Sequence, residues 1–193
     1  MNNNKEKMKN VLCAILLTFL VFGTVNAIGQ NTNEMGKIDK TTVKELNLEK
    51  FLGTWYEIAR FQHSFEKDLV GVTATYSLKK NGRIEVLNQG YQYKLDGVHK
   101  KATGKAKQPD PVNKPGQLKV SFFLFFYAEY NILELDSENY QWALIGSNTP
   151  GYLWILCRKP VMDEELYKQL VEKARQRGYN VENLVKVEQK HQL

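Results

Sequence analysis

Apolar and polar residues alternate along much of the chain after residue 50. From Val72 to Leu78, apolar side chains occupy every second position, with Thr or Ser between them, which is the period of a half-buried strand. Asn81–Gly82, the strongest short hairpin signal, follows directly. The same reasoning predicts eight strands, over residues 54–61, 72–78, 83–88, 100–107, 118–123, 130–135, 140–145 and 153–158.

Eight short strands at close spacing predict an all-β fold, either an antiparallel barrel or a sandwich. An eight-stranded up-and-down barrel has no exposed sheet edge and can enclose one small ligand. One helix is expected after the last strand, with Asp163 as N-cap, Leu170 and Ala174 on its apolar face, and Gly178 just past its end. We expect this α-helix to pack outside the barrel and a short strand at 183–187 to follow it.

The first 27 residues have the three parts of a secretory signal peptide. Three lysines within residues 5–9 precede a nearly continuous apolar run over residues 11–22. Val25 and Ala27 then occupy the −3 and −1 positions of a small-residue cleavage site. The apolar run is too short to cross a bilayer core of about 30 Å comfortably. We therefore predict an exported protein.

Cys13 does not turn this segment into a lipoprotein signal, because nearly all of the apolar run follows the cysteine. The sequence therefore has no lipobox at Cys13. The predicted organisation is a signal peptide at 1–27, a flexible leader at 28–46, a folded domain at 47–188 and a tail at 189–193.

Composition restricts the function classes. The chain has 193 residues, 42% hydrophobic and 25% charged, as in an ordinary globular domain. Two cysteines are too few for a disulfide scaffold, and His63, His99 and His191 fall in separate segments without metal-ligand spacing. The net charge is +6, or +4 after removal of the three lysines and one glutamate of residues 1–27, too little to indicate a nucleic-acid partner.

The chain contains no sequence motif of a Ser hydrolase, a P-loop or a dinucleotide site. We therefore expect no metal, no cofactor and no enzymatic activity. The carboxylates of Glu129, Glu134 and Asp136 alternate with apolar residues and are expected on the solvated outside of the barrel. Cys157 has apolar neighbours and is expected to be buried, and the alternative is a catalytic thiol in the cavity.

Gly53-Thr54-Trp55-Tyr56 is the G-x-W-Y signature of the lipocalin family, and the chain resembles that family over about residues 48–188. The resemblance extends to the branch of the bacterial outer-membrane lipocalins and apolipoprotein D, through residues 72–78, 118–123, 130–136, 142–146 and 153–158. It implies a calycin barrel whose base is closed by Gly53, Trp55, Tyr56 and Arg158. The Arg158 guanidinium would lie across the Trp55 ring and donate to backbone carbonyls of the N-terminal segment.

The resemblance also implies a carrier of fatty acids or lysophospholipids for membrane maintenance, in the periplasm or at the outer membrane, and a homodimer. An interior lined by aromatic residues suits such a ligand, and our candidate contacts are Tyr76, Tyr130 and Trp142. The alternative ligands are a siderophore, a pigment or a haem. An enzyme that uses Cys157 is a third hypothesis.

Residues 122–127 are six consecutive apolar residues that break the period of two. One interpretation is a strand end and tight turn packed at the barrel rim or under the helix. The other is an exposed apolar patch at the barrel mouth, which would contact a second copy or a membrane.

Overall fold

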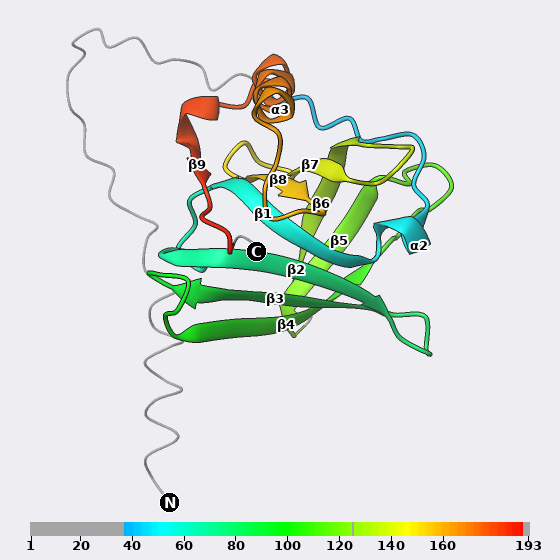
Figure 1. The fold of residues 1–193 in the computed structure, drawn as a ribbon. Helices are drawn as coiled ribbons and strands as arrows, with labels where there is room; N and C mark the ends of the chain where they lie inside the picture. Colours follow the sequence, from blue (N-terminus) through cyan, green and yellow to red (C-terminus); the bar gives the residue numbers. More distant parts are fainter. Residues whose placement is uncertain (1–36, 125, 191–193) are drawn as a thin grey trace, which may run out of the picture. The chain divides into compact units, whose positions relative to one another are not determined.

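The computed structural model describes residues 37–124 and 126–190. Eight strands form a closed antiparallel barrel in which each strand pairs with its neighbours in sequence, and the first strand also pairs with the eighth (Figure 1). The strands are β1 (Gly53–Phe61), β2 (Leu69–Leu78), β3 (Ile84–Gln92), β4 (His99–Lys107), β5 (Gln117–Phe123), β6 (Phe126–Leu135), β7 (Trp142–Gly146) and β8 (Leu153–Cys157). The predicted all-β barrel is confirmed. The predicted signal peptide at 1–27 lies outside the described residues.

Strand bounds differ from the predicted ones mainly at the ends. β6 begins at Phe126, four residues before the predicted start, because the residues before 130 lack clear alternation but still pair with β5. The structure also contains a short helix, α2 (Leu48–Phe51), and a 3₁₀ turn, η1 (Val181–Asn183), that the sequence did not predict. Elements of one turn are too short to show helical periodicity.

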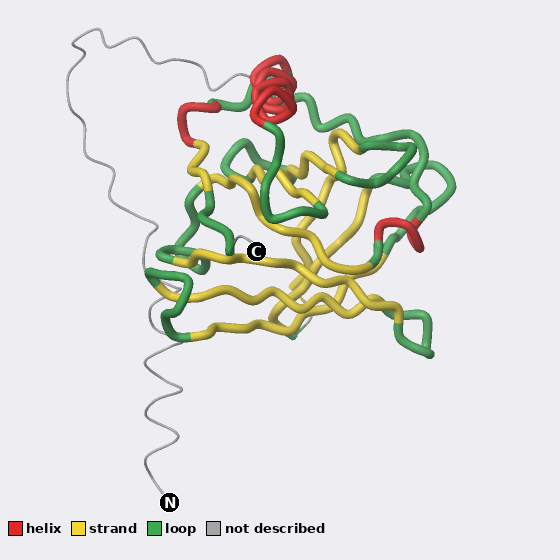
Figure 2. Tube along the Cα trace, viewed as in Figure 1, coloured by secondary structure: helices red, strands yellow, loops and turns green. Residues whose placement is uncertain are grey.

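The predicted helix is α3 (Glu164–Gln176), which lies outside the barrel (Figure 2). Asp163 caps it as expected, because its Oδ1 accepts from the backbone N–H groups of Glu165 and Leu166 at 3.0 Å each. Leu170 and Ala174 are fully buried against the barrel. After η1, β9 (Leu184–Lys186) pairs with β1 at the predicted place.

Two apolar cores result from the alternation of the strands. One fills the closed end of the barrel and includes Phe51, Trp55 and Leu118. The other, which we call the helix-side core, lies between α3 and the outer face of the barrel and includes Leu144, Ile155 and Leu170. The interior core lies on the side of the strands that faces the inside of the barrel.

The segment before α2 packs onto the barrel from residue 37 onward, although the sequence placed it in a flexible leader. Ile38 is buried, and the Val43 N–H donates to the Ile132 carbonyl at 3.0 Å. At the other end, Gln189 is buried rather than part of a free tail, since its Nε2 donates to the carbonyls of Glu57 and Val72 at 2.8 and 3.0 Å. These contacts join residues far apart in sequence, so local patterns could not reveal them.

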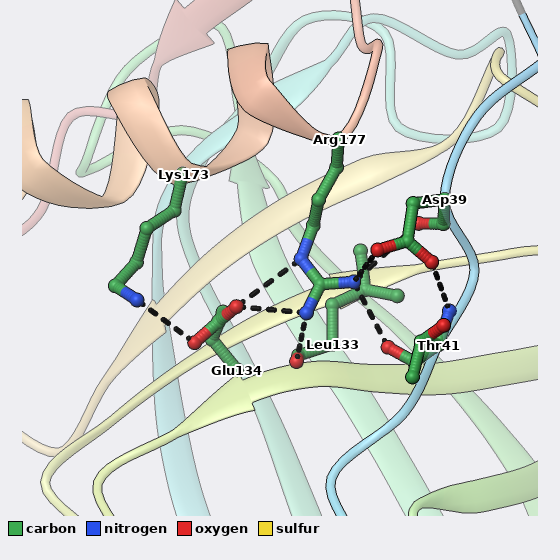
Figure 3. Close-up of polar contacts among 6 residues, drawn as sticks. All are labelled: Asp39, Thr41, Leu133, Glu134, Lys173 and Arg177. Carbon is green, nitrogen blue, oxygen red and sulfur yellow. Dashed lines mark hydrogen bonds and ion pairs between the residues drawn. The ribbon is translucent and has the colours of Figure 1, made fainter.

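Arg177, at the end of α3, connects the helix, β6 and the N-terminal segment (Figure 3). Its Nη2 donates to Glu134 Oε1 at 2.8 Å, and its Nη1 donates to the Thr41 carbonyl at 2.9 Å. Lys173 Nζ lies 3.1 Å from Glu134 Oε2. Burial alone would raise the pKa of Glu134, but the hydrogen bonds and charges of Arg177 and Lys173 outweigh it and lower that pKa. Glu134 is therefore on the outer face, as predicted, but half-buried and paired.

Candidate ligand-binding cavity

The closed end of the barrel is built around Trp55 and Arg158. The guanidinium carbon of Arg158 lies 3.8 Å from the centre of the Trp55 ring, and Trp55 is fully buried. Arg158 donates to the Thr54 carbonyl at 2.8 Å and to the last carbonyls of α2, including that of Leu52 at 2.8 Å. Gly53 has φ +91°, and a Cβ there would come within 3.3 Å of Arg158 Nη1. The structure therefore brings together Gly53, Trp55 and Arg158, although Gly53 and Arg158 are 105 positions apart in the sequence.

Above this end lies a cavity of about 850 Å³. Its wall is mainly apolar, because the inward positions of β2 to β6 and β8 carry small or branched side chains. These residues are Val72, Ala74, Val86, Ala102, Val120, Ala128 and Leu156. The cavity has the size and apolar character of a site for one small hydrophobic molecule.

Two of the three predicted contact residues line this cavity. The Tyr76 hydroxyl donates to the Tyr130 hydroxyl at 2.9 Å, and Phe51 packs against Tyr76 with ring centroids 5.5 Å apart. Burial raises the pKa of both tyrosines, so both stay protonated at neutral pH.

Trp142, the third predicted contact, lies elsewhere. On β7, Ala143 and Ile145 face the interior, so Trp142 faces outward and packs against the helix-side core. Tyr56 is also on the outer face and packs against that core. Trp154 lines the cavity instead. It shares its face of β8 with Leu156, so strand parity was the signal that could have identified it.

The cavity wall also contains an ionic cluster that sequence reasoning missed. Arg60 Nη1 lies 2.6 Å from Glu57 Oε1, and Trp154 Nε1 donates to Glu66 Oε2 at 3.2 Å. Glu57 and Glu66 line the cavity, and all three ionisable side chains are buried. Burial, together with the negative charge of Glu66, raises the pKa of Glu57 to about 8 against the opposing effect of Arg60.

The cavity opens between the loops β1–β2, β5–β6 and β7–β8, and aromatic side chains surround this mouth. Phe65, Phe122, Phe123 and Phe126 line it and are 44–76% exposed. The described part of the 122–127 segment is therefore an exposed apolar patch and is not packed under the helix. The basic residues that line the cavity are Lys67, Lys100 and Lys101.

The remaining candidates do not converge on the cavity. Cys157 is buried in the helix-side core, on the face of β8 opposite Trp154. His63 stacks on Tyr152 at the mouth, with ring centroids 4.2 Å apart, and His99 lies beside Tyr91. His191 is outside the described residues.

Within 37–124 and 126–190, no group of His, Cys, Asp and Glu side chains could hold a metal ion. In the same residues, no helix is long and apolar enough to cross a membrane.

Comparison with known proteins assigns this architecture to a family. A model of the lipocalin-like domain matches residues 46–189. The chain is 41% identical over 147 residues to the outer membrane lipoprotein Blc of Vibrio cholerae, covering 76% of this chain and 85% of that protein. It is 44% identical over 150 residues to Blc of Citrobacter freundii (77% and 82%). It is also 38% identical over 172 residues to apolipoprotein D of Mus musculus (84% and 87%).

Solved structures show the same fold. Lobster apocrustacyanin A1 superposes with a TM-score of 0.60 at 24% identity, covering 75% of this chain and 81% of that one. Insecticyanin from Manduca sexta superposes with a TM-score of 0.64 at 17% identity, covering 79% and 86%. At these identities the likeness concerns the barrel alone.

Proposed function

Since the chain belongs to the lipocalin family, whose members are generally binding and transport proteins, we propose that it holds a single-chain lipid, a fatty acid or a lysophospholipid, in its barrel. The observation that carries this proposal is the cavity of about 850 Å³ with a mainly apolar wall. Burying an acyl chain there would contribute about 25 cal/mol per Å² of apolar surface. Trp55 and Arg158 would keep the base of the barrel closed while the ligand enters at the mouth.

The proposed site of action is the bacterial envelope, where the protein would serve membrane maintenance. The Blc relatives are named as outer membrane lipoproteins, which is consistent with the signal peptide predicted at residues 1–27. We propose export to the periplasm or to the surface of the outer membrane. We propose passive transfer of the ligand rather than a reaction at Cys157, because this thiol faces away from the cavity.

The apolar patch at the mouth supports a further part of this proposal. Phe123 and Phe126 are 65% and 76% exposed and stack on each other, and Lys67 and Lys100 line the same opening. Exposed aromatic side chains beside lysines suit a membrane surface with anionic lipids. The mouth would then face the membrane from which the ligand comes. A second copy of the chain on this patch would be detected as a dimer by native mass spectrometry.

Lipid extraction and native mass spectrometry of the purified protein test the proposal. A co-purifying fatty acid or lysophospholipid is the expected result, and failure to displace a fluorescent fatty acid with any acyl ligand would refute it. Tryptophan fluorescence locates the site. Ligand binding should change the fluorescence of the wild-type protein. The change should be smaller in Trp154→Phe, because Trp154 lines the cavity. It should be as large as in the wild type in the matched control Trp142→Phe, because Trp142 lies on the outer face.

A further inference from the structure

The wall of the cavity contains two buried carboxyl groups, which the storage of an acyl chain does not require. Glu57 and Glu66 are 5% and 6% exposed and both line the cavity, and Arg60 is the guanidinium between them. Burying ionisable groups is costly unless they are paired and hydrogen-bonded. If both carboxyl groups were ionised, the two carboxylates and one guanidinium would lack one positive charge, and at neutral pH a proton on Glu57 makes up that difference.

Arg60 is not available to a ligand. Its Nη1 is bound to Glu57, and its Nη2 donates to the carbonyls of Glu66 and Leu69 at 2.7 and 3.1 Å. Among residues 37–124 and 126–190, its buried Nε has no hydrogen-bond partner, and Glu66 Oε2 lies 3.9 Å away. Arg60 itself is 3% exposed and, unlike Glu57 and Glu66, is not among the residues that line the cavity.

The cavity wall therefore presents polar oxygen atoms to a ligand. Glu57 Oε1 accepts from Arg60 Nη1 at 2.6 Å, and with a raised pKa of about 8 this carboxyl group holds a proton at neutral pH. Asn88 on β3 lines the same cavity, and its buried Oδ1 lacks a hydrogen-bond partner in the described part of the chain. An amide oxygen without a donor, in the same cavity as two buried carboxyl groups that share one guanidinium, indicates a place for a hydrogen-bond-donating cation.

We propose that Glu57 and Glu66 form a polar subsite inside the cavity, which accepts an ammonium or another hydrogen-bond-donating group of the ligand and disfavours an anionic one. This inference rests on the proposed function, because it concerns a ligand held in the same cavity. The ammonium of the ligand would then take the place of the proton on Glu57. A fatty carboxylate would have to place its charge away from this wall, toward the lysines of the mouth.

The subsite has a definite pH dependence. The ionisable groups facing Glu57 are Arg60 on β1, Glu66 from the β1–β2 loop, Tyr76 on β2 and Tyr130 on β6. The tyrosines stay protonated, and Glu57, with a pKa of about 8, holds a proton at neutral pH. A bound ammonium replaces that proton. The affinity for an ammonium should therefore rise by up to about tenfold per pH unit from about pH 6 to pH 8 and then level off.

The test uses three probes with the same ten-carbon chain: decylamine, decanol and decanoate. Their affinities are measured on the full purified protein by displacement of a fluorescent fatty acid at about pH 8, where Glu57 is about half ionised. We expect decylammonium to bind at least about tenfold more tightly than decanoate, as one hydrogen bond to a charged group implies. Glu57→Gln keeps the shape and the bond to Arg60 but should remove most of this preference. Glu138→Gln, in the exposed β6–β7 turn, is the matched control and should keep it.

The outcomes separate this inference from the proposed function. If the three probes bind equally, or decanoate binds most tightly, the polar subsite is refuted while the cavity remains a lipid site. If none of the three binds, the proposed function itself fails. The pH profile provides a second measurement on the wild type alone, so an unstable Glu57→Gln variant would leave the inference testable. A decylammonium affinity that is constant from about pH 6 to pH 8 would overturn it.

Discussion

Removing the Arg158 side chain should open the closed end of the barrel and lower the free energy of unfolding substantially. The guanidinium is the common partner of the Trp55 ring, the Thr54 carbonyl, the Tyr140 carbonyl and the C-terminal carbonyls of α2. The last carbonyls of a helix have no partner within the helix, so α2 depends on this side chain. Arg158→Ala removes the guanidinium from all of them, and the Phe51 carbonyl keeps one other donor, Trp55 Nε1 at 2.8 Å.

The size of the effect follows from the burial of each contact. The bonds from Arg158 to Thr54 and Lys50 lie at the surface, where water can replace the guanidinium. Three bonds are partly buried, to the carbonyls of Phe51, Leu52 and Tyr140. At about 1 kcal/mol each, with about 1 kcal/mol for the cation–π contact, the variant should lose about 4 kcal/mol. For a domain of this size, that loss lowers the Tm by about 8–16 °C.

Urea unfolding followed by the fluorescence of the buried Trp55 measures this loss. Arg158→Lys keeps the charge but not the planar fork, so it should lose about half as much. Arg175→Ala is the matched control, since Arg175 is exposed on α3 and pairs only with Glu172 among the described residues; it should change stability by less than about 0.5 kcal/mol. A loss below about 1 kcal/mol in Arg158→Ala would refute the reasoning.

Variants at the mouth, at the α3 contact and in the cavity wall test other parts of the interpretation. Replacing Phe123 and Phe126 by Ser should weaken co-sedimentation with vesicles containing an anionic phospholipid by more than about tenfold; unchanged sedimentation would exclude the patch as a membrane contact. Arg177→Ala should lower the free energy of unfolding by about 2–3 kcal/mol in urea. The lowered pKa of Glu134 adds stability above pH 4.5 that is lost as the pH falls through the folded-state pKa, so Glu134→Gln should flatten the acid limb of the Tm profile. The raised pKa of Glu57 acts in the opposite sense: its contribution declines as the pH rises from 4.5 to about 8, and Glu57→Gln melting curves should lack that decline.

The sequence was sufficient for the features that local patterns determine. Alternation identified β2 and the Asn81–Gly82 hairpin, because the side-chain period of a strand is two wherever one face is buried. Capping chemistry located α3, since Asp163 carries the N-cap and Gly178 takes φ +87° just past the end. These signals act within a few residues, so one sequence contains them completely.

Features that depend on long-range contacts were missed or misplaced. The packing of residues 37–46 depends on Ile132 and Arg177, which no local pattern connects with that segment. Trp142 was selected for its aromatic character, but the register of β7 turns its side chain outward. Aromatic composition thus indicated what kind of residue lines the cavity. Whether a given aromatic side chain faces into the barrel or outward depends on the alternation of the strand.

The ionic cluster shows why parity alone is also insufficient. Residues three apart on a regular strand face opposite sides, so Glu57 and Arg60 should not meet. β1 contains a bulge between Glu57 and Ala59, and beyond it Arg60 lies opposite Trp154 as Glu57 lies opposite Leu156. One extra residue therefore turns Arg60 into the barrel beside Glu57. If β1 ran regularly through Ile58 and Ala59, without the bulge, Arg60 would face outward and the two buried carboxyl groups would be left without their cation. The bulge is thus the local feature on which both the buried charge and the proposed polar subsite depend.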